Sequence, residues 1–265
     1  MSKIKAKHMS ERNVSKRTKS KKTKYLVILL ILIVGFAYCS YNFISLYIDY
    51  KNLDDIQEEI LKDTEITEID DNDSDLYGNL LDVDLSELQA ENSDTVGWIQ
   101  VSGTDINYPV VKSTNNSYYL SHDFNKNINK GGWIFSDYRT DLDNLSQNNI
   151  IYGHNNSTLK SLKNALTEEW LNDSDNYNIY VVSENYSYLF QVCSVYTIIT
   201  ETYYLTTSFE NDDEFSSFID TIINRSEHDF DTTLNTDDII LTLSTCNGTG
   251  KKLAVHAKLI KESYK

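Results

Sequence analysis

The stretch Asp238-Ile-Ile-Leu-Thr-Leu-Ser-Thr-Cys-Asn-Gly-Thr-Gly250 sets an apolar run directly before a cysteine and a polar loop that contains glycine. Runs of Ile, Leu and Thr are typical of a buried β-strand, and glycine-containing segments are typical of turns. We therefore expect a strand over residues 238–244, with Cys246 at the junction of strand and loop. A side chain in that setting is held rigidly while it faces solvent or a groove, so Cys246 is a candidate nucleophile.

Seven further stretches beyond residue 95 are rich in Ile, Val, Tyr and Thr, and many of them alternate between apolar and polar residues. Such stretches predict β-strands. They lie at residues 97–101, 107–112, 132–136, 149–153, 178–183, 188–199 and 253–261. With residues 238–244 they make eight strands, and a mostly-β chain of this kind predicts a closed barrel or a sandwich.

Two helical patches interrupt the strands, at residues 158–166 and 212–224. In the second patch Phe215, Phe218, Ile219, Ile222 and Ile223 recur at the spacing of one helix face.

The N-terminal part of the chain has the charge pattern of a membrane anchor. Residues 1–24 hold ten Lys and Arg and one acid, and no charge follows until Asp49. At about 1.5 Å per residue, an uncharged helix over residues 25–48 is long enough for a bilayer core of about 30 Å. Basic flanks stay in the cytoplasm, so we expect a disordered cytoplasmic tail over 1–24, a transmembrane anchor over 25–48 and an extracytoplasmic body.

Two other interpretations of the apolar run are weaker. A cleaved signal peptide is disfavoured because the run is long and no small-x-small cleavage site follows it. Cys39 suggests a lipoprotein acceptor, but the bulky Tyr38 precedes it.

Residues 49–94 are acidic and of mixed pattern, and we expect a partly helical stalk. Apolar residues at helical spacing predict a helix near residues 52–63, and a second short helix is expected over 85–92. The run Asp70-Asp-Asn-Asp-Ser-Asp75 lacks the spacing and the glycine of an EF-hand loop, which favours a solvated linker over a calcium site. The catalytic domain is expected to cover residues 95–265.

The charge and the cysteines exclude two classes of function. The net charge of −16 argues against a nucleic-acid surface, which needs clustered cations. The three cysteines, Cys39, Cys193 and Cys246, show no CxxC motif and no metal-binding spacing with histidine, which argues against a zinc site. Cys193 lies within a predicted strand and fits a buried structural residue, and a Cys193–Cys246 disulfide is the alternative in an oxidising compartment.

A cysteine nucleophile needs a proton partner, which is usually histidine. His154 ends the run Asn148-Asn-Ile-Ile-Tyr-Gly-His154, which is again an apolar strand meeting a polar loop. Spacing alone puts His154 only modestly ahead of His122 and His256, each of which could be a structural histidine. His8 lies in the basic tail, and His228 lies in an acidic loop.

Several motifs together resemble the sortase family, and class B sortases in particular. Thr242-Leu-Ser-Thr-Cys246 is similar to the family's TLxTC signature. The other matching segments are Gly97-Trp-Ile-Gln-Val-Ser-Gly-Thr-Asp-Ile-Asn-Tyr-Pro-Val-Val111, Tyr118-Tyr-Leu-Ser-His-Asp-Phe124, Ile134-Phe-Ser-Asp-Tyr-Arg139 and Asn149-Ile-Ile-Tyr-Gly-His154-Asn155. The resemblance extends from about residue 95 to 261.

The resemblance implies a closed eight-stranded barrel and a Cys-His-Arg active site, with Cys246 as nucleophile and His154 as acid and base. Ser244, Thr245 and Asn247, in and after the signature, are candidate substrate-binding residues. The family's arginine falls on Lys252, and no arginine occurs after Arg225. Three interpretations remain open: Lys252 supplies the cation for the oxyanion and substrate, Arg139 moves in, or the enzyme is weak or inactive. Arg139 is assigned a structural role first.

The resemblance also implies an activity. The partners would be surface proteins with a C-terminal sorting signal, cleaved after Thr through a thioacyl intermediate, and the amine of a peptidoglycan precursor. No cofactor or metal is implied. The alternatives are a pilin-polymerising sortase, a cysteine endopeptidase, and an inactive membrane-tethered binding module.

Overall fold

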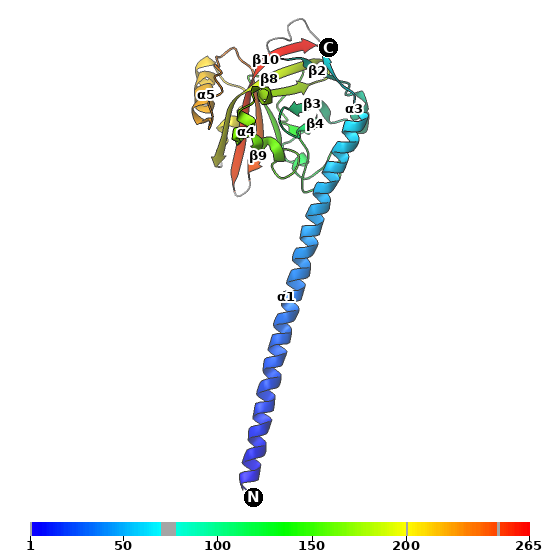
Figure 1. Cartoon of the computed structure of the whole chain (residues 1–265), viewed down its shortest axis with the longest axis vertical. Helices are drawn as coiled ribbons and strands as arrows, with labels where there is room; N and C mark the ends of the chain where they lie inside the picture. The colour runs from blue at the N-terminus through cyan, green and yellow to red at the C-terminus, as the bar shows by residue number, and fades with distance from the viewer. Residues whose placement is uncertain (1, 70–77, 200, 248–249) are drawn as a thin grey trace. The chain divides into compact units, whose positions relative to one another are not determined.

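The computed structural model describes residues 2–69, 78–199, 201–247 and 250–265, with the backbone alone for residues 2–21, 246 and 247. The chain divides into two compact units, residues 1–48 and residues 49–265. The larger unit contains the β-barrel (Figure 1).

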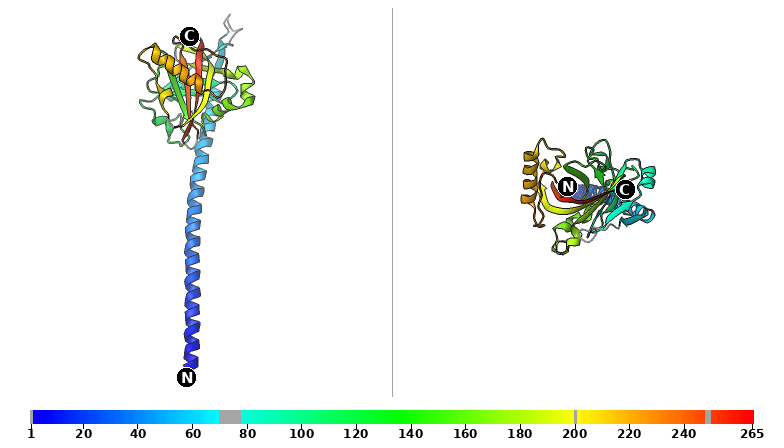
Figure 2. Two further views of the ribbon diagram at one scale, coloured as in Figure 1. Left: turned by 90° about the vertical axis from the view of Figure 1, so that its left-hand side faces the viewer. Right: turned by 90° about the horizontal axis from the view of Figure 1, so that it is seen from above.

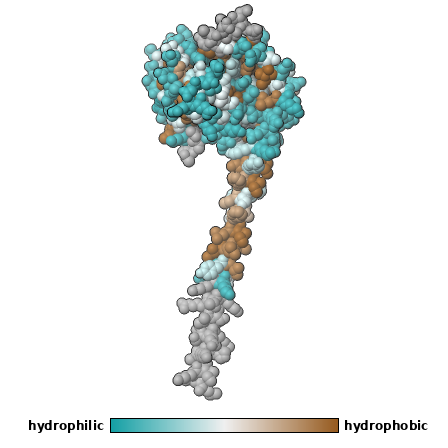
Figure 3. Space-filling model, viewed as in Figure 1, coloured by the Kyte–Doolittle hydropathy of each residue, from teal (hydrophilic) through white to brown (hydrophobic). Residues whose placement is uncertain are grey.

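The first unit consists of the N-terminal part of helix α1 (Ser2–Asp63). The prediction of a disordered basic tail is therefore wrong for residues 2–24. This segment has no proline or glycine, is rich in lysine, and extends an apolar helix, and adding residues to a helix costs less than nucleating one. The large apolar side chains between Tyr25 and Ile48 are exposed and form an apolar band (Figure 3). Helix α1 is long and apolar enough to cross a membrane by length and composition.

The second unit is built on a closed barrel with the strand order β10-β8-β7-β3-β4-β5-β6-β9. The strands are β3 (Thr95–Val101), β4 (Asn107–Val111), β5 (Phe135–Ser136), β6 (Asn148–His154), β7 (Asn178–Val182), β8 (Tyr186–Ile199), β9 (Ile240–Asn247) and β10 (Lys251–Tyr264). All eight predicted strands are present, and closure excludes the sandwich. The β4–β5 and β6–β9 pairs are parallel and the other pairs are antiparallel.

Both faces of the sheet are covered around β9. Leu241 and Leu243 belong to the main apolar cluster, whereas Ile240 belongs to a second cluster. Successive strand residues point to opposite faces, so these clusters lie on opposite sides of the sheet. The second cluster includes Phe215 and Ile222 of helix α5 (Asp212–Arg225), which lies against the outside of the barrel (Figure 2). This helix confirms the prediction at residues 212–224.

The remaining helices are short. The predicted patch at 158–166 forms the 3-10 helix η2 (Lys160–Leu166). Four one-turn elements were not predicted: η1 (Tyr118–Leu120), α4 (Glu168–Leu171), η3 (Ser174–Tyr177) and η4 (Tyr203–Leu205).

Residues 49–69 and 78–94, predicted as a partly helical stalk, belong to the same compact unit as the barrel. Helix α1 continues to Asp63, β1 (Ile66–Ile69) pairs with β2 (Leu80–Val83), and α3 (Ser86–Glu91) follows, as expected near 85–92. Leu53, Leu80 and Val83 are buried. The two strands have four residues each, which is too short for a reliable alternating pattern. The acidic run at 70–75 lies outside the described residues.

Candidate active site

Three positions predicted from the sequence meet in one row across the sheet. Cys246 on β9 is the register partner of His154 on β6 and of Lys252 on β10. Register partners lie about 5 Å apart between Cα atoms and share a face of the sheet. We call these three residues the catalytic row, after the role that is proposed for them below. It lies within the last two residues of β6 and β9 and the first two of β10, so it sits at one end of the sheet.

The catalytic row lies on the outer face of the barrel. Leu241, Leu243 and Thr245 alternate with Thr242 and Ser244 along β9, and the leucines pack in the main core. Position 246 therefore shares the opposite face with positions 242 and 244. A residue at the strand end on this face is not enclosed by the barrel interior.

The ring of His154 is held by the backbone of a neighbouring turn. His154 Nε2 lies 2.9 Å from the carbonyl oxygen of Leu120 in η1. Because a carbonyl oxygen can only accept, Nε2 carries the hydrogen, and in the neutral ring Nδ1 is unprotonated. His154 is half-buried, and its Nδ1 has no hydrogen-bond partner among the side chains that the structure describes.

Gly132 allows this turn to approach the histidine. Its φ of +61° lies in the left-handed region, and an added β-carbon would come within 2.5 Å of the Tyr119 carbonyl oxygen and 2.9 Å of His154 Cδ2. Any side chain at this position would displace the ring or the turn. Sequence analysis did not identify Leu120 or Gly132, although the glycine pair at 131–132 was a signal of close backbone approach.

The two cations considered for the missing arginine have different surroundings. Lys252 is partly exposed at the start of β10. Arg139 donates from Nε and Nη2 to both oxygens of Asp137 at 2.8 Å, and from Nη2 to the carbonyl of Leu205 at 3.0 Å. Burial would raise the pKa of Asp137, but the bonds from Arg139, Tyr152 and Asn116 hold that pKa below its usual value. Arg139 would have to leave this fork to reach an oxyanion, which favours Lys252.

Two of the three residues expected to bind substrate are buried. Ser244 is 3% exposed, and its Oγ lies 3.1 Å from the hydroxyl of Tyr204 in η4. Thr245 is 2% exposed, and its hydroxyl has no hydrogen-bond partner among the described residues. Neither hydroxyl is open to a peptide in this conformation, so a substrate-binding role for these side chains remains a prediction. The side chain of Asn247 lies outside the described residues.

His256, the strongest rival to His154, belongs to a closed hydrogen-bonded network that we call the buried ring. It consists of Asn148, Tyr196, Tyr203, Thr242 and His256, and it closes on the backbone of η4. His256 is completely buried, which lowers its pKa to about 3, so its imidazole is neutral at physiological pH.

Each donor in the buried ring can be assigned from its partner. Asn148 Nδ2 donates to the carbonyls of Tyr204 and Thr206, so Asn148 Oδ1 accepts from Thr242 Oγ1 at 2.6 Å. The single hydroxyl hydrogen of Thr242 is then used, and Oγ1 accepts from His256 Nδ1 at 2.8 Å.

The other half of the buried ring follows from the same assignment. His256 Nε2 is left as an acceptor for the Tyr196 hydroxyl at 2.9 Å, and Tyr196 accepts in turn from Tyr203 at 2.7 Å. Both nitrogens of His256 are therefore occupied, which identifies it as a structural residue.

The other cysteine and histidines also have structural surroundings. Cys193 is a free buried thiol that donates to the carbonyl of His256 at 3.3 Å, which excludes the Cys193–Cys246 disulfide. Burial raises the pKa of Cys193 to about 12. His122 stacks on Tyr118 with ring centroids 4.0 Å apart, and His228 packs edge-on against Phe230.

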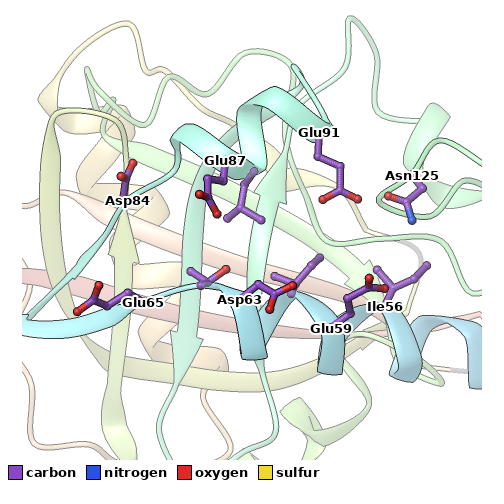
Figure 4. Close-up of a pocket in the computed structure, with 11 residues that line it drawn as sticks. Ile56, Glu59, Asp63, Glu65, Asp84, Glu87, Glu91 and Asn125 are labelled. Carbon is purple, nitrogen blue, oxygen red and sulfur yellow. The ribbon is translucent and has the colours of Figure 1, made fainter.

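A cavity of about 310 Å³ lies away from the catalytic row, between the end of α1, α3 and the loop at Asn125 (Figure 4). Its lining is acidic and contains neither cysteine nor histidine. The carboxylates are those of Glu59, Asp63, Glu65, Asp84, Glu87 and Glu91. Within the described ranges, no group of three or more His, Cys, Asp or Glu is arranged to hold a metal ion. The cavity therefore offers no alternative cysteine–histidine pair.

Comparison with known proteins gives a consistent result, although no family model matches the chain. Sortase B of Staphylococcus aureus is 36% identical over 187 residues, which cover 68% of this chain and 75% of that protein. Sortase B of Listeria monocytogenes is 31% identical over 198 residues, covering 74% and 76%.

Solved structures agree. The Staphylococcus aureus sortase B–substrate complex has a TM-score of 0.62 at 36% identity, covering 67% of this chain and 84% of that one. Sortase B from Bacillus anthracis in complex with AAEK1 has a TM-score of 0.69 at 34% identity, covering 81% and 99%.

Proposed function

This chain belongs to the class B sortases, a family of cysteine transpeptidases, and from that premise we propose that it joins surface proteins to peptidoglycan at the outer face of a membrane. The substrate would carry a C-terminal sorting signal and be cleaved after a threonine. The observation that carries the proposal is the catalytic row, in which Cys246 is the register partner of His154 and of Lys252.

The first half-reaction forms a thioacyl enzyme. The thiolate of Cys246 attacks the carbonyl carbon of the threonine, and the electron pair of the C=O bond moves to oxygen. Lys252 and backbone N–H groups after Cys246 stabilise this oxyanion. His154 gives its proton to the leaving amine as the C–N bond breaks.

The second half-reaction transfers the acyl group. An amine of a peptidoglycan precursor attacks the thioester, His154 removes a proton from that amine, and the sulfur leaves as the thiolate. The product is a new amide, and the enzyme returns to its starting state.

The hydrogen bond of His154 supports its assigned role. With Nε2–H held by Leu120, the ring keeps one orientation while Nδ1 exchanges a proton. In other nucleophile–histidine pairs, a carboxylate fixes the tautomer and the orientation of the histidine in the same way.

The membrane anchor proposed for residues 25–48 is supported by the length and apolarity of α1. It would hold the enzyme, the sorting substrate and a lipid-linked amine on one surface, which raises their effective concentration.

The decisive experiment is mass spectrometry of the full chain in membranes, incubated with a sorting-peptide library and an acceptor amine. We expect a thioacyl adduct on Cys246 and a product with a new amide bond. Cys246→Ala should abolish both, whereas the matched variant Cys193→Ala should retain both. Products that end only in a free carboxyl would support an endopeptidase instead.

A second candidate function is a binding module without catalysis, and the lysine at the family's arginine position favours it. Lysine offers a flexible point charge where arginine offers a planar fork of donors. The absence of any adduct on Cys246, together with saturable binding of a sorting peptide, would establish this alternative.

A further inference from the structure

We propose that the loop at residues 124–132 is a membrane-contact loop, which holds the catalytic end of the barrel at the bilayer surface through the side chain of Ile128. This inference rests on the anchor in the proposed function. It adds a second contact with the lipid, made by the folded domain itself.

The first observation is the exposure of Ile128 on an ordered loop. Its side chain is 83% exposed, the largest exposed fraction among the large apolar side chains described. The backbone around Ile128 is hydrogen-bonded on both sides. Asp123 N–H donates to the carbonyl of Asn127, and Asn127 N–H donates to Asp123 Oδ1. Asn129 N–H donates to the carbonyl of Ser121 at 3.0 Å. Single exposed apolar side chains are ordinary on protein surfaces, and Ile128 is distinguished by its position near Asp49.

The second observation is where this loop lies along the chain. Asn129 Nδ2 donates to the carbonyl of Asp49 at 2.8 Å. Asp49 follows the apolar run 25–48 directly, so it must lie at the membrane surface if that run spans the bilayer. A β-carbon at Gly131 would collide with Leu53, which means that the loop is pressed against the first turns of α1 beyond Asp49.

The third observation is charge. Residues 124–132 contain Lys126 and Lys130 and no acidic residue, in a chain with a net charge of −16. Lys126 also reaches Asp94, at 3.1 Å. A segment with two lysines, one of them in an ion pair, and one protruding apolar side chain fits the headgroup region of a bilayer.

The same contacts bring the catalytic row close to the lipid. Asn156, two residues after His154, donates to the hydroxyl of Tyr50. Gly132, which packs on His154, ends the membrane-contact loop. A nucleophile that lies close to the bilayer surface would act on peptide bonds and amines that are also close to that surface.

The test uses the full chain in vesicles of phosphatidylcholine and phosphatidylglycerol, with and without brominated acyl chains that quench nearby tryptophan. The native Trp98, Trp133 and Trp170 are buried, so the wild-type protein gives the background. Three single variants are compared: Ile128→Trp, Tyr264→Trp and Tyr47→Trp.

We expect loss of emission from Ile128→Trp and Tyr47→Trp, and background behaviour from Tyr264→Trp. Tyr264 is 70% exposed, but it adjoins Lys265, which contacts β2. Strand β2 pairs with β1, which follows the end of α1. Helix α1 ends at Asp63, which lies about 20 Å along the helix from Asp49. Tyr264 is thus a control of similar exposure.

The outcomes separate the two proposals. Quenching of Tyr47→Trp without quenching of Ile128→Trp overturns the membrane-contact loop and leaves the anchor standing. Quenching of neither variant overturns both. A second experiment measures activity. Ile128→Ser should lower turnover of a membrane-tethered sorting substrate and leave turnover of a soluble sorting peptide unchanged. Equal turnover of the tethered substrate by the variant and the wild type would contradict the proposal.

Discussion

The catalytic row and the buried ring share strands β6, β9 and β10, and the buried ring also includes Tyr196 of β8 and Tyr203 of η4. Cys246 and Thr242 both lie on β9, and Lys252 and His256 both lie on β10. In the buried ring each imidazole nitrogen of His256 has a fixed partner and no access to water. In the catalytic row His154 has one carbonyl partner and partial exposure. The difference teaches that a histidine beside β9 is left able to exchange a proton only where the fold has not already occupied both of its ring nitrogens.

The largest expected effect concerns the histidine of the catalytic row. His154→Ala should lower kcat/KM for a sorting peptide on the order of 10⁴-fold, because both proton transfers lose their carrier. The melting temperature should stay near that of wild type, since the ring is half-buried and makes one hydrogen bond. Turnover by His154→Ala close to the wild-type rate would remove this residue from the chemistry.

The cation of the catalytic row comes next. Lys252→Ala should lower kcat about 10²–10³-fold, the usual effect of losing an aimed oxyanion donor. Lys252→Arg should keep or raise the rate, because arginine donates in a planar fork. The measurement is steady-state kinetics of the three proteins, and equal rates in all of them would exclude a role for Lys252.

Titration of His256 in the buried ring should change the free energy of unfolding rather than the catalytic rate. Burial lowers the pKa of His256 to about 3, below its ordinary value near 6.5 in the unfolded chain. The unfolded state therefore gains a proton first as the pH falls, and the folded state loses stability below about pH 6.5. Between pH 7 and pH 5 the loss attributable to His256 is about 2 kcal/mol.

Urea unfolding of wild type and His256→Gln across this pH range tests that contribution. The variant should be less stable than wild type at pH 7, because the ring is broken, and the gap should narrow toward pH 5. A gap that stays constant with pH would mean that His256 is not held neutral by its surroundings.

The smallest effect is expected for the cysteine of the core. Cys193→Ala should cost about 1 kcal/mol of stability, from one small cavity and one weak hydrogen bond. Because burial raises its pKa to about 12, Cys193 should resist alkylation at neutral pH, as peptide mapping after iodoacetamide treatment can measure. Rapid modification of Cys193 in the folded protein would contradict the contrast between the two cysteines.

The individual strands could be predicted from sequence because they carry strong local signals, whereas their closure into a barrel rather than a sandwich was implied only by the family resemblance. The predicted strand at 149–153 forms as β6, and the run before Cys246 forms as β9. The β1–β2 sheet could not be predicted, since each strand has only four residues and pairing, not local preference, stabilises it. The helix over residues 2–24 was not predicted, because the high density of positive charge was given more weight than the absence of proline and glycine.

The sequence predicted which residues make up the candidate site, but it did not predict the residues that surround and contact them. The signature at Thr242–Cys246 and the strand end at His154 identified both members of the proposed pair. Spacing could not separate His154 from His256, because their difference lies in partners from distant segments such as Tyr196 and Leu120. Such partners follow from the closed barrel, which a single sequence does not supply.

The parallel pairing of β6 with β9 has a consequence for biosynthesis. His154 and Cys246 stand about 90 residues apart in the chain and become neighbours at the last pair of that ladder. Contacts between distant segments form late, after the entropy of closing a long loop has been overcome. On the proposed mechanism, a nascent or misfolded chain would have no working nucleophile, and reactivity would arise only in the fully folded molecule.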